Sequence, residues 1–83
     1  MNIQAKIENF ILEDLLAGSR QAIPSDEPLF ATGTLDSLGT LRLIAFLEET
    51  FGLTINDGDV VDTNFGTIEK LTHFVDSRKR AEF

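Results

Sequence analysis

The sequence predicts a small all-α protein built from three main helices and one short helix. In three separate segments the apolar residues recur at steps of three and four, the spacing that places side chains on one face of a helix. Both prolines fall between the first two of these segments, where they interrupt helical structure. A chain of 83 residues has room for one domain, which we expect to span residues 1–83.

The composition narrows the classes of function. The chain has 14 acidic and 7 basic residues and a formal net charge of −7, which argues against nucleic acids and anionic membranes and favours basic protein partners. The absence of cysteine excludes disulfides, thiolate zinc sites and a cysteine nucleophile. No apolar run approaches the ~18–20 residues of a membrane span, and the N-terminus lacks the pattern of a signal peptide. We therefore expect a cytoplasmic protein.

The first helix is predicted over residues 2–16. Gly18 follows its last apolar residue and suits a left-handed C-terminal cap. The residues expected on its inner face are Ile3, Ile7, Phe10, Ile11 and Leu15.

A long loop is predicted from Ser19 to Asp36, because the periodicity stops there and Pro24 and Pro28 disfavour helix. Loops longer than ~12–15 residues are uncommon in compact domains and tend to be functional. We expect Leu29 and Phe30 to anchor this loop to the core.

The second helix is predicted to begin near Ser37 and to run to about Thr50, with Gly52 ending it. Its inner face is expected to carry Leu41, Ile44, Leu47 and Phe51, with Leu43 at the edge. The opposite face carries Leu38, Arg42, Ala45, Phe46 and Glu49. Apolar residues clustered on an outer face favour a docking patch, with Arg42 and Glu49 as its charged members.

The remaining chain is predicted to form a loop at 53–55, a short helix at 60–63 capped by an acidic turn, and a final helix from about Thr67. The turn does not fit a calcium-binding loop. With Gly58 at the sixth position, the first, third and twelfth positions hold Leu53, Ile55 and Asn64, which are poor ligands. We predict no metal site.

Ser37 follows the long loop and begins a helix, and three roles can be weighed for it. A serine at a helix start commonly caps free backbone amides. A nucleophilic elbow of the G-x-S-x-G type fails because Leu35 replaces the first glycine. The sole histidine, His73, lies on the last helix, so catalysis by this chain is not expected. A phosphate ester on Ser37 would be stabilised by the positive end of the helix dipole.

The segment Asp36-Ser37-Leu38, followed by Leu43-Ile44-x-x-Leu47-Glu48-Glu49-x-Phe51-Gly52, resembles the signature of acyl and peptidyl carrier proteins. With the order of the helices, the resemblance covers roughly residues 3–78. It implies an acyl-carrier-like four-helix bundle with a short third helix. It also implies that Ser37 receives 4′-phosphopantetheine from coenzyme A and carries substrate as a thioester. Asp36 would help recognition by the transferase, and Leu38 would contact partner enzymes.

The resemblance implies three classes of partner: a phosphopantetheinyl transferase, an adenylate-forming acyl or aminoacyl ligase, and a downstream acyltransferase or synthase. The segment 33–40 resembles D-alanyl and other stand-alone aminoacyl carriers, and the segment 64–68 resembles the boundary in discrete carriers that serve adenylating ligases, where a D-alanyl carrier is expected to contain tryptophan. Arg42 and Gly39 stand where fatty-acid carriers are usually acidic. The cargo stays open between an amino acid, a fatty acyl chain and a polyketide intermediate. We expect the protein to be a monomer. The alternative function is a small helical protein-interaction module with the same fold that is not modified.

Overall fold

The computed structural model describes residues 2–81, except the side chains of Arg80 and Ala81. The part of the chain that it describes is helical and contains no strand, which confirms the predicted all-α bundle with a short third helix. Its elements are α1 (Ile3–Phe10), the π-helical segment η1 (Ile11–Leu15), α2 (Ser37–Phe51), the 3₁₀ turn η2 (Asp57–Asp59), α3 (Asp62–Phe65) and α4 (Ile68–Ala81).

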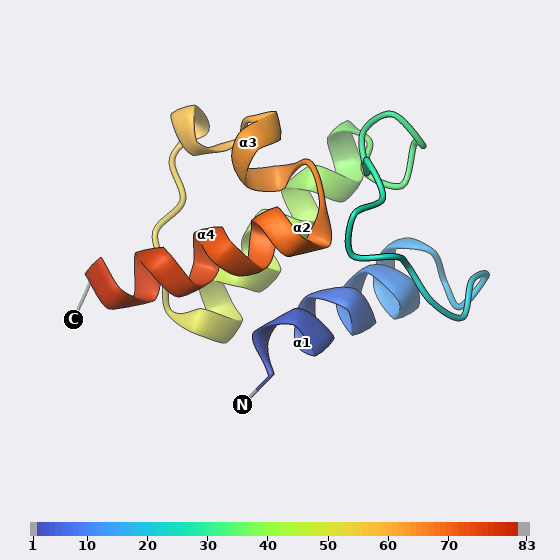
Figure 1. Cartoon of the computed structure of the whole chain (residues 1–83), viewed down its shortest axis with the longest axis horizontal. Helices are drawn as coiled ribbons and strands as arrows, with labels where there is room; N and C mark the ends of the chain where they lie inside the picture. The colour runs from blue at the N-terminus through green and yellow to red at the C-terminus, as the bar shows by residue number, and fades with distance from the viewer. Residues whose placement is uncertain (1, 82–83) are drawn as a thin grey trace.

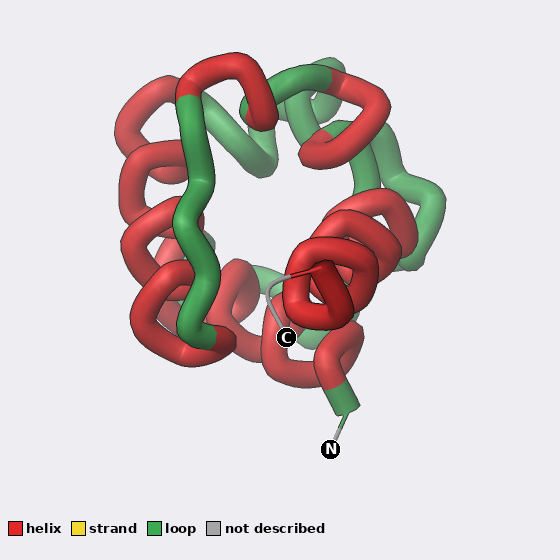
Figure 2. The backbone as a smooth tube through the Cα atoms, turned by 90° about the vertical axis from the view of Figure 1, so that its left-hand side faces the viewer, coloured by secondary structure: helices red, strands yellow, loops and turns green. Residues whose placement is uncertain are grey.

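The helices surround one apolar core. Helices α1 and α3 both pack against α4, and α2 contacts α1 and α4 (Figure 1). Figure 2 shows α2 and α4 on opposite sides of the core, with η2 and α3 closing one end. The fully buried large side chains are Ile7, Ile11, Leu29, Leu43, Leu47, Phe65, Ile68, Leu71 and Val75.

The first helical segment differs from the continuous α-helix predicted over residues 2–16. After Phe10 the chain widens into the π-helical η1, in which the Leu16 amide donates to the Ile11 carbonyl at 2.9 Å. The Gly18 amide donates to the carbonyl of Leu12 at 2.8 Å. Because a π turn holds an extra residue, both Ile11 and Leu12 reach the core, and Leu12 was not predicted there. Gly18 has the predicted left-handed conformation, with φ of 75°.

The loop between η1 and α2 is anchored by three buried residues, Ile23, Leu29 and Leu35. The predicted anchor Leu29 is confirmed, and its amide donates to the Gly66 carbonyl at 2.8 Å. The other predicted anchor was wrong: Phe30 is 40% exposed. Residues 29–33 form a turn that buries Leu29 and leaves Phe30 at the surface, an orientation that no periodic pattern predicts.

Helix α2 is rotated relative to the predicted orientation. Its buried positions are Gly39, Leu43, Leu47 and Phe51. Leu43, which was expected at the edge of the inner face, therefore lies at its centre. Leu41, predicted to be inside, is 65% exposed. Gly39 is buried at the start of α2, and Leu41, two residues further along the helix, therefore faces the surface.

The elements of the C-terminal half are those predicted from the sequence, with small shifts in their bounds. The segment 53–55 is a loop, as predicted, and α4 begins one residue after Thr67, whose hydroxyl accepts a hydrogen bond from the Lys70 amide at 3.0 Å. The short helix, expected at 60–63, occupies Asp62–Phe65. The acidic turn forms the separate element η2, and Val60 and Val61 form a short non-helical link between η2 and α3.

Candidate functional site

The start of α2 places Ser37 at the surface with its hydroxyl free. Asp36, not Ser37, is the N-cap: its carboxylate oxygen Oδ1 accepts a hydrogen bond from the Gly39 amide at 2.7 Å. The Asp36 carbonyl also accepts bonds from the amide and hydroxyl of Thr40, at 2.9 and 2.7 Å. Ser37 Oγ makes no hydrogen bond to any residue between 2 and 81. The capping role weighed for Ser37 is therefore filled by its neighbour.

A surface groove of about 470 Å³ opens beside Ser37. One wall comes from the loop before α2, the floor from α2 itself, and the other wall from η2 and Val60. Among the described residues that line it, the charged ones are Asp36 and Asp57, so the groove is mostly apolar with a negatively charged edge. The lining residues are Phe30, Leu35, Asp36, Ser37, Thr40, Leu41, Ile44, Asp57 and Val60.

Large apolar side chains are exposed on these same elements. Leu38 and Leu41 are 67% and 65% exposed, while Phe30 and Val61 are 40% and 43% exposed. Among the described residues these four are the large exposed hydrophobics, and Phe30 and Leu41 also line the groove. Such clustering is typical of a surface that meets other proteins. We call these four residues the apolar rim.

Three residues of the apolar rim were not predicted as surface contacts from the sequence, namely Phe30, Leu41 and Val61. One signal for Leu41 was available: it lies four residues after Ser37, and positions four apart share one face of a helix. Phe30 and Val61 lie outside regular helix, where the sequence pattern gives no orientation.

The structure separates most of the predicted partner-binding residues from Ser37. Leu38 lies next to the serine and shares a small hollow with Arg42. Ala45, Phe46 and Glu49 line a different hollow, of about 300 Å³, which Arg42 also borders together with residues of the first helical segment. Arg42, Ala45 and Glu49 are exposed, whereas Phe46 is half-buried. The prediction that Phe46 belongs to an outward apolar patch was wrong.

Phe46 is covered because aromatic rings pack around it. Its ring stacks on that of Phe10 with centroids 4.2 Å apart and meets the edge of Phe51 at 6.2 Å. Arg42 also reaches the first helical segment, where its Nη1 donates to the Asp14 carbonyl at 3.5 Å. These contacts join α2 to α1 and η1.

The loop that leads to Ser37 is braced by Glu27. Its carboxylate accepts two bonds from the Arg20 guanidinium, at 2.8 and 2.9 Å, and one each from the hydroxyls of Thr32 and Thr34. The bonds from Arg20, followed by those from the two threonines, lower the pKa of Glu27 to about 2, although partial burial opposes this shift. Glu27 is therefore ionised at neutral pH and holds both ends of the loop segment 20–34.

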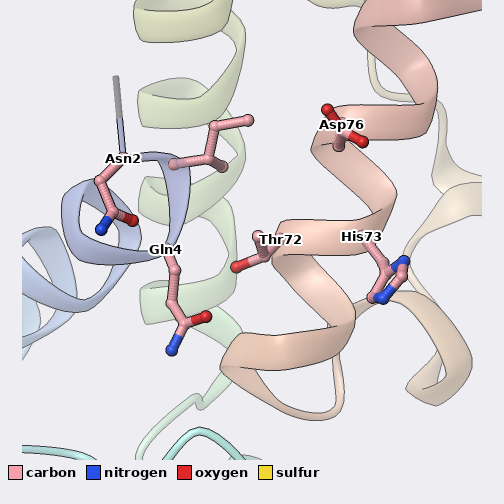
Figure 3. Close-up of a pocket in the computed structure, with 6 residues that line it drawn as sticks. Asn2, Gln4, Thr72, His73 and Asp76 are labelled. Atoms are coloured by element: carbon pink, nitrogen blue, oxygen red, sulfur yellow. The ribbon is translucent and has the colours of Figure 1, made fainter.

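A larger hollow of about 600 Å³ lies between the start of α1 and α4, away from Ser37 (Figure 3). Thr72 points toward Gln4 there, and its hydroxyl donates to the Ile68 carbonyl at 2.8 Å. His73 is exposed and points away from α1. Within residues 2–81 no group of acidic, histidine or cysteine side chains could hold a metal ion, and no helix is long and apolar enough to cross a membrane.

The start of α2 suits a covalently attached, phosphate-linked group. Ser37 offers an exposed hydroxyl with no competing bond in the described chain, and the positive end of the helix dipole favours an anion at this position. The adjoining groove gives such a group an apolar surface to lie along.

Two comparisons point to one family, and a third shows the fold. Residues 10–75 match the family described as "Phosphopantetheine attachment site". D-alanyl carrier proteins of Streptococcus pyogenes serotypes M5 (strain Manfredo) and M1 are 38% identical over 56 residues, which is 68% of this chain and 71% of theirs. A chain in a crystal structure of an FAD-dependent dehydrogenase superposes with a TM-score of 0.77 and 28% identity, over 83% of this chain and 97% of that one.

The structural likeness confirms the predicted carrier-like all-α fold. Proteins of this kind work with transferase and ligase partners and are generally not catalytic themselves. The chain belongs to the phosphopantetheine-attachment family and is a carrier protein that bears 4′-phosphopantetheine covalently.

Proposed function

We propose that Ser37 is the attachment site of the phosphopantetheine and that the carrier is one domain over residues 1–83. The observation that carries this proposal is the division of roles at the start of α2. Asp36 caps the helix, so the adjacent Ser37 hydroxyl is exposed and uncommitted. Asp36 is also proposed to assist the transferase and its magnesium ion, through the carboxylate oxygen that does not bond Gly39.

The proposed surface for partner enzymes is the apolar rim around Ser37, with Leu38 and Leu41 as its most exposed members. Basic partners would be attracted by the net charge of −7, and this attraction should weaken as salt concentration rises. Arg42, Ala45 and Glu49 form a neighbouring exposed face that a dedicated ligase could read. Phe46 contributes by supporting that face from below.

An amino acid is the proposed cargo, loaded by an adenylate-forming ligase and passed to a downstream acyltransferase or synthase. The D-alanyl carriers among the relatives support an aminoacyl group. The negatively charged edge of the groove, made by Asp36 and Asp57, favours a cargo with an ammonium group over an anionic one. The protein is proposed to act as a monomer in the cytoplasm, where tethering replaces diffusion by a high local concentration.

The dehydrogenase structure supports a second class of downstream partner. The similar chain in it has about the length of this protein, since it is covered almost completely. A flavin-dependent dehydrogenase that oxidises the carrier-bound group is therefore a candidate. Its action would be seen in intact-protein mass spectra as the loss of two hydrogens from the loaded cargo.

Intact-protein mass spectrometry after incubation with coenzyme A, magnesium and a phosphopantetheinyl transferase tests the attachment site. The wild type should gain one phosphopantetheinyl group and Ser37→Ala none. Ser77→Ala is the matched control, because it removes an equally exposed helical serine. Ser37→Ala should change the free energy of unfolding by no more than about 0.5 kcal/mol, since its hydroxyl makes no bond to the described chain. Loading of Ser37→Ala would refute the assignment.

The alternative, an unmodified interaction module, predicts a different result. The wild type would then gain no mass with its cognate transferase while a control carrier is loaded in parallel. Leu38 would still matter for partner binding, but Ser37 would be dispensable in every assay.

A further inference from the structure

One wall of the groove beside Ser37 consists of the turn η2 and Val60, and Val60 packs against the core. The turn η2 contributes Asp57 to the groove, yet none of its residues is buried. Val60, which follows the turn and also lines the groove, is half-buried. Val60 anchors one end of this wall, so the position of the turn η2 itself depends mainly on polar contacts.

Asp59 is the centre of those contacts. Its carboxylate accepts one bond from the backbone amide of Asn56 and another from Arg78, both at 2.9 Å. Its carbonyl accepts a bond from the side-chain amide of Asn64 at 3.0 Å. The bond from Arg78, and then that from Asn56, lower the pKa of Asp59 below its usual value, so the carboxylate is charged at neutral pH.

Arg78 reaches this turn from α4, the helix that follows α3 in Figure 1. One guanidinium nitrogen, Nη2, binds the Asp59 carboxylate, and the other, Nη1, donates to the Thr54 carbonyl at 2.8 Å. The same group lies over the ring of Phe74, 4.9 Å from its centroid. A planar fork of donors can hold two acceptors at once, so Arg78 fixes both ends of the segment 54–59 against α4.

We propose that Arg78 is a positioning residue for the site at Ser37, because it holds the η2 wall of the groove in the arrangement that partner enzymes recognise. This inference rests on the proposed attachment at Ser37. Arg78 itself would touch neither the phosphopantetheine nor the cargo. It acts through Asp59 on Asp57 and Val60, so its loss should weaken recognition and leave the attachment chemistry intact.

The structure provides a matched control in the next residue. Lys79 carries the same charge on the same helix, but its ammonium group lies over the Phe51 ring, 5.7 Å from the centroid. Arg78→Gln and Lys79→Gln therefore remove the same charge, and only the first releases the turn. Arg78→Lys keeps the charge, but a single amino group cannot reproduce the fork.

The first measurement is amide hydrogen exchange, which is independent of any partner. Arg78→Gln should accelerate exchange at residues 57–61 and leave the core of α2 and α4 unchanged, whereas Lys79→Gln should leave both unchanged. Equal exchange in the two variants would overturn the positioning role, whether or not Ser37 is the attachment site.

The second measurement is steady-state loading of the apo protein by a phosphopantetheinyl transferase. Arg78→Gln should raise KM about three- to tenfold at unchanged kcat, because the wall must be ordered during binding. The KM of Arg78→Lys should lie between those of Arg78→Gln and the wild type. Asp59→Asn should raise KM as well. The double variant Asp59→Asn/Arg78→Gln should have a KM only slightly above that of either single variant, because both changes break the same contact.

The two proposals fail in different ways. A wild type that gains no mass refutes attachment at Ser37. A wild type that loads, together with an Arg78→Gln variant of unchanged KM, refutes the role of Arg78 alone. If Arg78→Gln does not fold, the exchange and KM measurements on Asp59→Asn decide the question, and unchanged values there would refute the proposal.

Discussion

Asp36 combines two roles that two substitutions can separate. Its Oδ1 atom caps α2 through the Gly39 amide at 2.7 Å, and its charge is proposed to assist the transferase. Asp36→Ala removes the cap and the charge. Asp36→Asn keeps an oxygen that can accept the same bond but removes the charge.

The size of the stability effect follows from the capping bond. Replacing an N-cap aspartate by alanine costs about 1 kcal/mol, and in a domain of this size that lowers Tm by roughly 4–8 °C. Asparagine caps about as well as aspartate and loses only the interaction with the helix dipole, about 0.3–1 kcal/mol at an exposed site. Asp36→Ala should therefore melt at a lower temperature than Asp36→Asn, and both should be loaded more slowly than the wild type.

Thermal unfolding followed by far-ultraviolet circular dichroism gives Tm, and a time course of intact-protein masses gives the loading rate. Loading is measured well below the lowest Tm, so that all three proteins are folded. Equal Tm values for the two variants would show that the Gly39 bond does not stabilise α2. Loading of Asp36→Asn at the wild-type rate would show that Asp36 acts through the cap alone.

Three further predictions concern other parts of the chain. Gly66→Ala should cost about 1–3 kcal/mol in urea unfolding, because its Cβ would lie 2.5 Å from the Asp62 carbonyl oxygen, whereas Gly58→Ala meets nothing within 4 Å and should be nearly neutral. The Glu27 pKa of about 2 lies below its ordinary 4.5, so its stabilisation is present at neutral pH and lost as pH falls through this interval. The difference in Tm between the wild type and Glu27→Gln should therefore shrink as the pH falls from 4.5 to about 2. Arg42→Glu should change stability by about 0.5 kcal/mol or less and reduce ligase affinity, which titration calorimetry would measure.

The sequence was sufficient for the fold class because helix periodicity and the positions of glycine and proline are local signals. The exact inner face of α2 was not accessible in the same way. Leu41 and Leu43 are both leucines near one stripe, and the packing of α2 on the core, which buries Gly39, Leu43 and Leu47, decides which of the two is buried. The π-helical turn likewise depends on packing, since nothing in the residues 11–15 marks it.

The site shows the same division between local and tertiary information. Ser37 could be found from its motif and its place at a helix start. That Asp36 performs the capping could not be decided from the pair Asp36-Ser37, because either side chain can cap. The contact of Arg78 with Asp59 joins residues 19 positions apart. No periodic pattern predicts such a contact, which depends on how α4 passes beneath the turn.

The bond between Leu29 and Gly66 has a consequence for the order of folding. It joins the long loop to the end of α3, and a second bond ties the Ser25 carbonyl to the Glu69 amide at 3.0 Å. Contacts between such distant segments carry a large loop-closure entropy and form late. The loop wall that holds Phe30 and Leu35 is thus completed only after the C-terminal helices have docked. A nascent or partly unfolded chain would display Ser37 without its groove, so the transferase would modify finished molecules in preference to unfinished ones.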